Sequence, residues 1–140
     1  MKLPFYQIDA FTNKIFGGNP ACVVPLKEWL PNSTLLNIAK ENAVPETAFF
    51  IEHGERFHLR WFTPEIEMDL CGHATLATAH CLKTQMNYPK KEIVFETLSG
   101  DLTVAMYDEM YHLDFPSRMP IASELPKSIK NSLNIMPKEV

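Results

Sequence analysis

The chain has 140 residues, a formal net charge of −4 at pH 7 and 46% hydrophobic residues. This length suits one domain with a substantial core, and the acidic balance leaves no basic surface for nucleic acid. An acidic residue at position 9 comes too early for a signal peptide, and no apolar run is long enough to cross a bilayer. We therefore expect a cytoplasmic protein whose partners include neither nucleic acid nor membrane.

The first half of the chain predicts strands together with one surface helix. Residues 16–20, Phe-Gly-Gly-Asn-Pro, predict an exposed loop. Residues 35–41 carry an apolar stripe typical of a helix, with Asn32 or Ser33 as its N-cap. Strands are expected where β-favouring residues cluster or alternate with polar ones, at residues 5–11, 21–24, 47–51 and 57–62.

The stretch from residue 70 to residue 82 contains no Lys, Arg, Asp or Glu. A helix without a charged face has to be buried, so we expect the rest of the chain to wrap around it. The first amide groups of such a helix lack internal partners and form a natural seat for a carboxylate. The plainer alternative is that Gly72 only allows a sharp turn and His73 caps the helix. This stretch by itself favours the plainer alternative.

The remaining chain predicts an antiparallel meander and then a tail. Three apolar runs at short spacing are typical of such a meander, at residues 92–97, 102–106 and 111–115. Four prolines follow in a mostly polar context, with room for a short helix only at 128–135. We expect an α+β domain over residues 1–116, in which a mostly antiparallel sheet is rolled into a barrel around the central buried helix. Residues 117–140 are expected to be a linker or trailing segment that leads towards a second domain.

The cysteine pattern argues against both disulfides and a structural metal. Cys22, Cys71 and Cys81 are odd in number and lack Cys-x-x-Cys spacing. His73 and His80 could share one face of a helix, but no carboxylate nearby in the sequence completes a ligand set. We therefore expect no metal, and we interpret His80 and Cys81 as buried structural residues.

Two residues are candidates for acid–base chemistry. Glu46 lies between a proline and an apolar strand, and burial there would raise the pKa of its carboxyl group and make it a better base. Acids at strand ends are more often solvated turn residues, and position alone favours that reading. Cys71 precedes the helix start, where the helix dipole and a neighbouring histidine could lower the pKa of its thiol. It could equally be a packed thiol, which we favour.

Several motifs, taken together and in order, resemble the PhzF-like family of phenazine-biosynthesis-related isomerases. The resemblance covers roughly residues 3 to 120 and implies the diaminopimelate-epimerase-like fold, in which each domain is a sheet rolled around a central helix. The motifs are Gln7-Ile8-Asp9-Ala10-Phe11-Thr12, Phe16-Gly17-Gly18-Asn19-Pro20-Ala21, Pro45-Glu46-Thr47-Ala48-Phe49, Arg60-Trp61-Phe62-Thr63-Pro64, Leu70-Cys71-Gly72-His73-Ala74-Thr75, Thr97-Leu98-Ser99-Gly100 and Leu113-Asp114-Phe115-Pro116.

The resemblance implies a cofactor-independent isomerase or epimerase that moves a proton between carbons of a small carboxylic acid. It places the general base on Glu46, whereas the position of Glu46 alone favours a solvated turn residue. It also places the substrate at the helix start and at the glycine-rich loop, with Gly18, Asn19, Gly72, His73 and Ala74 as binding residues. No metal or organic cofactor is implied.

Two departures from the family pattern leave alternatives open. In related cofactor-free amino-acid epimerases, a Cys at the position of Cys71 is the acid–base group, but Gly-Asn-Gly follows it there. Here Gly-His-Ala follows, which favours Glu46 and leaves a Cys-based racemase as an alternative. Family members are also about twice this long, with the active site between two similar domains. We therefore expect a homodimer or a missing C-terminal half, with a non-catalytic carboxylate-binding or interaction module as the other alternative.

Overall fold

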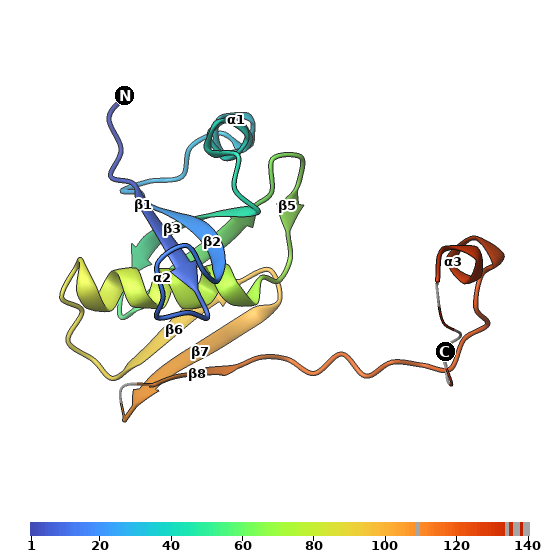
Figure 1. Ribbon diagram of the computed structural model, residues 1–140. Coiled ribbons are helices and arrows are strands. Elements are labelled where there is room, and N and C mark those ends of the chain that lie inside the picture. The colour runs from blue at the N-terminus through green and yellow to red at the C-terminus, as the bar shows by residue number, and fades with distance from the viewer. Residues whose placement is uncertain (109, 134, 136–137, 139–140) are drawn as a thin grey trace.

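A single curved sheet encloses one helix in the computed structural model, which describes residues 1–108, 110–133, 135 and 138 (Figure 1). The order of the paired strands is β1-β2-β3-β4-β6-β7-β8, and the short β5 pairs with β4. The strands are β1 (Tyr6–Ala10), β2 (Asn19–Pro25), β3 (Glu46–His53), β4 (Arg56–Phe62), β5 (Glu67–Met68), β6 (Glu92–Thr97), β7 (Gly100–Tyr107) and β8 (Met110–Asp114).

The enclosed helix is α2 (Gly72–Thr84), and its small side chains let the sheet approach closely. Ala74, Ala77 and Ala79 are fully buried. The strands pack large side chains against this helix, among them Phe50, Leu59, Trp61 and Phe95. The charge-free stretch therefore forms the buried helix that the sequence predicts.

Most strand pairings are antiparallel, which confirms the predicted fold class. Two pairings are parallel, β2 with β3 and β4 with β6. Each parallel pair is joined through a helix, α1 (Asn32–Asn42) in the first case and α2 in the second. Parallel neighbours need such a long crossover, because a tight turn can only join antiparallel strands. The sequence analysis did not foresee these two parallel pairings.

Two element boundaries differ from the sequence-based expectation. β2 begins at Asn19 instead of residue 21, because Asn19 and Pro20 continue the antiparallel ladder with β1. α1 begins at Asn32, and Pro31 is its N-cap, without a side-chain hydrogen bond. Pro31 suits this position because the N-cap residue takes an extended backbone conformation outside the helix.

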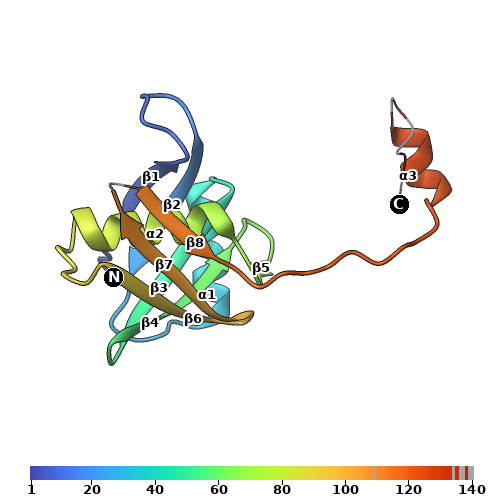
Figure 2. The same ribbon diagram turned by 90° about the horizontal axis from the view of Figure 1, so that it is seen from below.

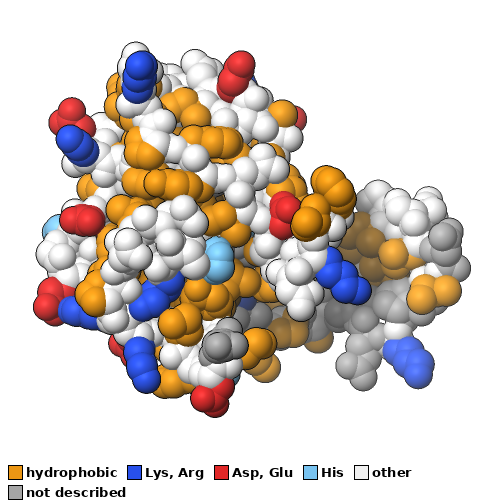
Figure 3. Space-filling model, turned by 60° about the vertical axis from the view of Figure 1, so that its left-hand side comes forward, with side chains coloured by type: hydrophobic (Ala, Val, Ile, Leu, Met, Phe, Trp, Pro, Cys, Tyr) orange, Lys and Arg blue, Asp and Glu red, His pale blue; other side chains and the backbone are white. Residues whose placement is uncertain are grey.

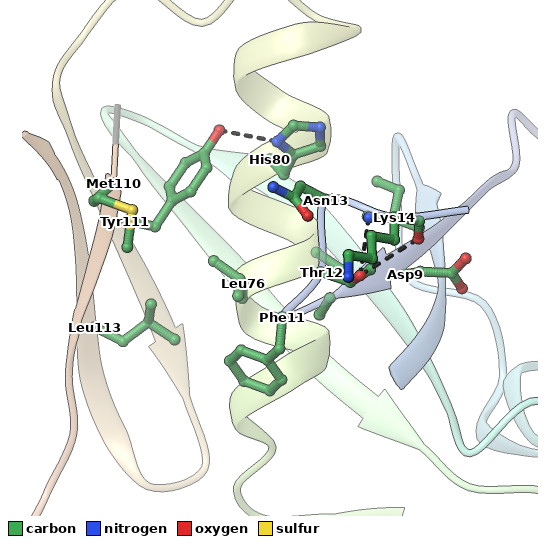
Figure 4. Close-up of a pocket in the computed structure, with 13 residues that line it drawn as sticks. Asp9, Phe11, Thr12, Asn13, Lys14, Leu76, His80, Met110, Tyr111 and Leu113 are labelled. Carbon is green, nitrogen blue, oxygen red and sulfur yellow. Dashed lines mark hydrogen bonds between the residues drawn. The ribbon is translucent and has the colours of Figure 1, made fainter. Parts of the chain in front are cut away.

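The sheet leaves one side of α2 less covered, because β1 and β8 do not pair with each other among the described residues. A groove of about 780 Å³ lies between them across the helix (Figure 4). Tyr111 of β8 and His80 of α2 meet in this groove, with 3.1 Å between the Tyr111 hydroxyl oxygen and His80 Nδ1. The predicted barrel is therefore an open one.

Beyond β8, the chain runs away from the sheet to a short helix, α3 (Lys127–Ser132), which has no buried residue (Figures 1 and 2). This helix overlaps the expected one at 128–135, where residue 134 lies outside the described residues. The division between a domain at 1–116 and a segment at 117–140 stays a prediction. Within the described ranges, no helix is long and apolar enough to cross a membrane.

Candidate active site

Glu46 is the first residue of β3, and neighbouring contacts fix where that strand starts. Thr47 is fully buried, and its hydroxyl oxygen accepts a hydrogen bond of 3.0 Å from Asn42 Nδ2 of α1. Ala48 and Phe50 pack in the core around α2. Because side chains alternate along a strand, Glu46 lies on the same face as these two residues. Its side chain is 17% exposed and therefore stays reachable from solvent.

His73 brings the start of α2 into contact with Glu46. Its Nε2 atom lies 3.1 Å from Glu46 Oε2, and its side chain is 9% exposed. Despite this short distance, the two groups are not aligned as a hydrogen bond, and Nε2 has no hydrogen-bond partner among the described residues. A buried polar atom without a partner is uncommon in a folded protein. The nearest charged neighbour of this nitrogen is the Glu46 carboxylate.

Cys71 lies on the other side of the same imidazole ring. Its Sγ atom is 3.5 Å from His73 Nδ1. Burial raises the pKa of the Cys71 thiol to about 11, and the peptide N–H group of Ala74 acts in the opposite direction with a smaller effect. Cys71 is therefore a thiol and not a thiolate at neutral pH. This state disfavours it as a general base.

The start of α2 has the features of an anion seat. Cys71 is the N-cap in an extended conformation, makes no side-chain capping bond, and is followed by no acidic residue in the first turn. The first turn of the helix retains the positive end of the dipole, and its Ala74 and His73 amide groups face the Cys71 sulfur. Gly72 allows the Phe115 ring to pack closely against the helix start, because a Cβ atom at Gly72 would lie only 3.2 Å from that ring. His73 does not cap the helix.

Gly18 and Asn19 lead into β2, the neighbour of β3. Gly18 has a φ of 79°, and a Cβ atom there would collide with the Ala10 carbonyl oxygen. Asn19 stands two residues before Ala21, which pairs with Glu46, so Asn19 lies on the same face of the sheet. No hydrogen bond joins Asn19 to Glu46 or His73 among the described residues. The expected binding role of Gly18 and Asn19 stays a prediction.

The structure corrects one expectation about the histidines. His80 was expected to be buried, but it is only partly buried and contacts Tyr111 in the groove. His73 does have a carboxylate beside it, that of Glu46. The sequence analysis missed this because it considered only carboxylates nearby in the sequence. No spacing signal could have found it, since β4 and β5 separate β3 from α2 in the sequence.

The comparisons with known proteins agree with the resemblance. The family model described as phenazine biosynthesis-like protein (PhzC-PhzF) matches residues 8–136. An uncharacterized isomerase of Pseudomonas aeruginosa is 42% identical over 140 residues, which is 100% of this chain and 54% of that protein. Phenazine biosynthesis-like domain-containing protein 2 of mouse is 42% identical over 124 residues, 83% of this chain and 43% of that protein. The chain belongs to the PhzC-PhzF family.

Solved structures support both the family and the fold. The crystal structure of a PhzF-family phenazine biosynthesis protein of Enterococcus faecalis matches with a TM-score of 0.86 and 43% identity, over 99% of this chain and 54% of that one. A predicted epimerase of Pseudomonas aeruginosa matches at 21% identity with a TM-score of 0.65, which shows the fold alone. The chain spans about half the length of the first curated relatives it matches.

Proposed function

We propose that this chain supplies half of a cofactor-independent isomerase or epimerase, which moves a proton between carbons of a small carboxylic acid. The observation that carries the proposal is the pair formed by Glu46 and His73 at the start of α2. It combines a carboxylate that solvent can reach with a buried imidazole and the positive end of a helix dipole. The names of the relatives as isomerases support the reaction class.

In this proposal Glu46 is the general base. It takes a proton from a carbon next to a carbonyl or an unsaturated group and returns it to another carbon. The amides at Gly72, His73 and Ala74 hold the substrate carboxylate and stabilise negative charge as it develops. His73 contacts Glu46 and thus orients its carboxylate towards the bound acid.

The proposal needs a second half-site, because the matched relatives are about twice as long as this chain. A C-terminal half or a second copy of this chain would provide it. Hydrophobic side chains gather over much of one face of the molecule (Figure 3), and Phe11, Ile15 and Phe16 are at least 70% exposed. Exposed apolar patches of this kind mark association surfaces. We propose a homodimer or a two-half assembly, located in the cytoplasm.

The experiment that tests the proposal is solvent deuterium uptake. The protein is incubated in deuterated water with a panel of cyclic unsaturated carboxylic acids and amino acids, and the recovered acids are examined by mass spectrometry. Deuterium at carbon requires that the protein removes and returns a proton. Binding to the panel without labelling would favour the alternative of a carboxylate-binding module.

A Cys-based racemase is the less favoured mechanism. Its base would be the Cys71 thiolate, but burial raises the pKa of that thiol to about 11. Only a minute fraction of Cys71 is ionised near neutral pH. Glu46 is therefore the better supported base.

A further inference from the structure

We propose that Glu46, Cys71 and His73 form a binding site for a zinc ion, which would block proton transfer at this site. The three side chains offer one sulfur, one nitrogen and one oxygen ligand atom, and these atoms all lie within 4.8 Å of one another. Thiolate and imidazole ligands together with one carboxylate suit zinc and disfavour magnesium and calcium, which prefer oxygen ligands.

The separation between Cys71 and His73 already fits tetrahedral zinc. With a Zn–S bond of about 2.3 Å and a Zn–N bond of about 2.1 Å, a tetrahedral ion holds its sulfur and nitrogen ligands about 3.5 Å apart. Cys71 Sγ and His73 Nδ1 are 3.5 Å apart. The carboxyl group of Glu46 contacts the ring at Nε2 instead. A rotation of the Glu46 side chain towards Nδ1 would bring the third ligand to the same ion.

The other ring nitrogen of His73 limits where the third ligand can bind. His73 Nε2 is buried and lies 3.1 Å from Glu46 Oε2, with no hydrogen-bond partner among the described residues. Because an ion on Nδ1 is not bound by Nε2, the Glu46 carboxylate has to move away from Nε2 to complete the site. The Glu46 side chain is partly exposed. Three protein ligands leave the fourth zinc position open to water or to an inhibitor.

Zinc binding involves a simple exchange at sulfur. The S–H bond of Cys71 breaks, its proton passes to the buffer, and the sulfur lone pair binds the ion, with no change in oxidation state. Bound zinc would also occupy the carboxylate oxygen that Glu46 needs as a base. Metal binding is independent of the proposed function, whereas inhibition rests on it.

The other two cysteines supply the matched controls. Cys22 and Cys81 are also buried free thiols. In the part of the chain that the structure describes, neither belongs to a group of three possible ligands. A metal that binds thiols without a defined site would bind Cys22 and Cys81 as well as Cys71.

The test is a titration of the full chain with Co²⁺ under reducing, oxygen-free conditions. One equivalent is expected to produce the near-ultraviolet charge-transfer band of a cobalt–thiolate bond and the visible bands of tetrahedral cobalt, and one equivalent of Zn²⁺ should abolish both. Cys71→Ser should lose the charge-transfer band, and His73→Gln and Glu46→Gln should bind more weakly. Cys81→Ser should behave as the wild type. Circular dichroism of each variant confirms that it is folded.

The outcomes separate this proposal from the proposed function. The zinc site is overturned if the wild type shows no cobalt–thiolate band, or if folded Cys71→Ser keeps it. If cobalt binds as expected but the metal-free protein exchanges no deuterium, the site stands and the proposed function fails. If the protein exchanges deuterium and zinc binds without slowing that exchange, the blocking role is wrong. Suppression of exchange by one equivalent of zinc, reversed by a chelator, supports both.

Discussion

Glu46 Oε2 and His73 Nε2 lie 3.1 Å apart, where the start of β3 meets the start of α2. The contact joins the sheet to the N-terminal end of the buried helix. It also places a candidate base with a partly exposed side chain beside a buried imidazole.

Cys71→Ala should retain proton exchange and lose little of it, because the Cys71 thiol is protonated at neutral pH. In the folded wild type, alkylation of Cys71 by iodoacetamide at pH 7.5 should be much slower than alkylation of a free thiol in solution. Peptide mapping after a timed reaction measures this rate. Rapid, selective alkylation of Cys71 would show a reactive thiolate and revive the Cys-based mechanism.

Gly18→Ala should destabilise the fold, by about 1 to 3 kcal/mol. Gly18 has a φ of 79°, and the added methyl group would collide with the Ala10 carbonyl oxygen and the Thr12 side chain. Gly54→Ala is the matched control, because Gly54 also has a positive φ of 64° but open space around it. Urea unfolding compares the two variants. Equal losses of unfolding free energy would mean that the contact at Gly18 costs nothing.

Much of the fold could be predicted from the sequence because its signals are local. The burial of α2 follows from the missing charges between residues 70 and 82. The meander β6-β7-β8 follows from short turns between apolar runs. The parallel pairings and the start of β2 at Asn19 depend instead on contacts between distant segments. Local patterns carry no information about such contacts.

The candidate site was less predictable for the same reason. Position alone favoured a solvated Glu46, and only the family resemblance singled it out as a base. The carboxylate beside His73 was missed because it comes from a different element. The sequence also pointed to Cys71 at the helix start. Its high thiol pKa depends on burial, which a local sequence pattern does not reveal.

The surface contact between His53 and Glu96 should make a small contribution to pH-dependent stability. His53 Nδ1 lies 2.6 Å from Glu96 Oε2, and this hydrogen bond lowers the pKa of the Glu96 carboxyl group. A lowered pKa in the folded state stabilises the protein above the ordinary glutamate pKa, and this contribution is lost as the pH falls through the folded-state value. Urea unfolding of wild type and Glu96→Gln from pH 7 to pH 3 measures it.

The difference between those two proteins should shrink towards pH 3. Glu92→Gln on the same strand is the control, because Glu92 forms no ion pair among the described residues. A Glu96→Gln difference that stays constant across this pH range would mean that the hydrogen bond to His53 does not contribute in solution.

Self-association should be detectable by sedimentation velocity at micromolar concentration. Phe16 is fully exposed and Ile15 is 84% exposed, which is costly for a lone domain in water. The double variant Ile15→Ser with Phe16→Ser should shift the distribution towards the monomer if this loop forms the contact. A wild type that stays monomeric over the whole concentration range would count against a homodimer.

The central claim is that Glu46 removes the substrate proton. The most direct measurement is the rate of deuterium uptake into whichever acid of the panel the wild type labels, compared among the wild type, Glu46→Gln and Glu52→Gln. Glu52 lies on the same strand but is exposed at its other end. We predict that Glu46→Gln lowers the rate by about 10²- to 10⁴-fold and that Glu52→Gln leaves it unchanged. Uptake at the wild-type rate in folded Glu46→Gln would contradict the account.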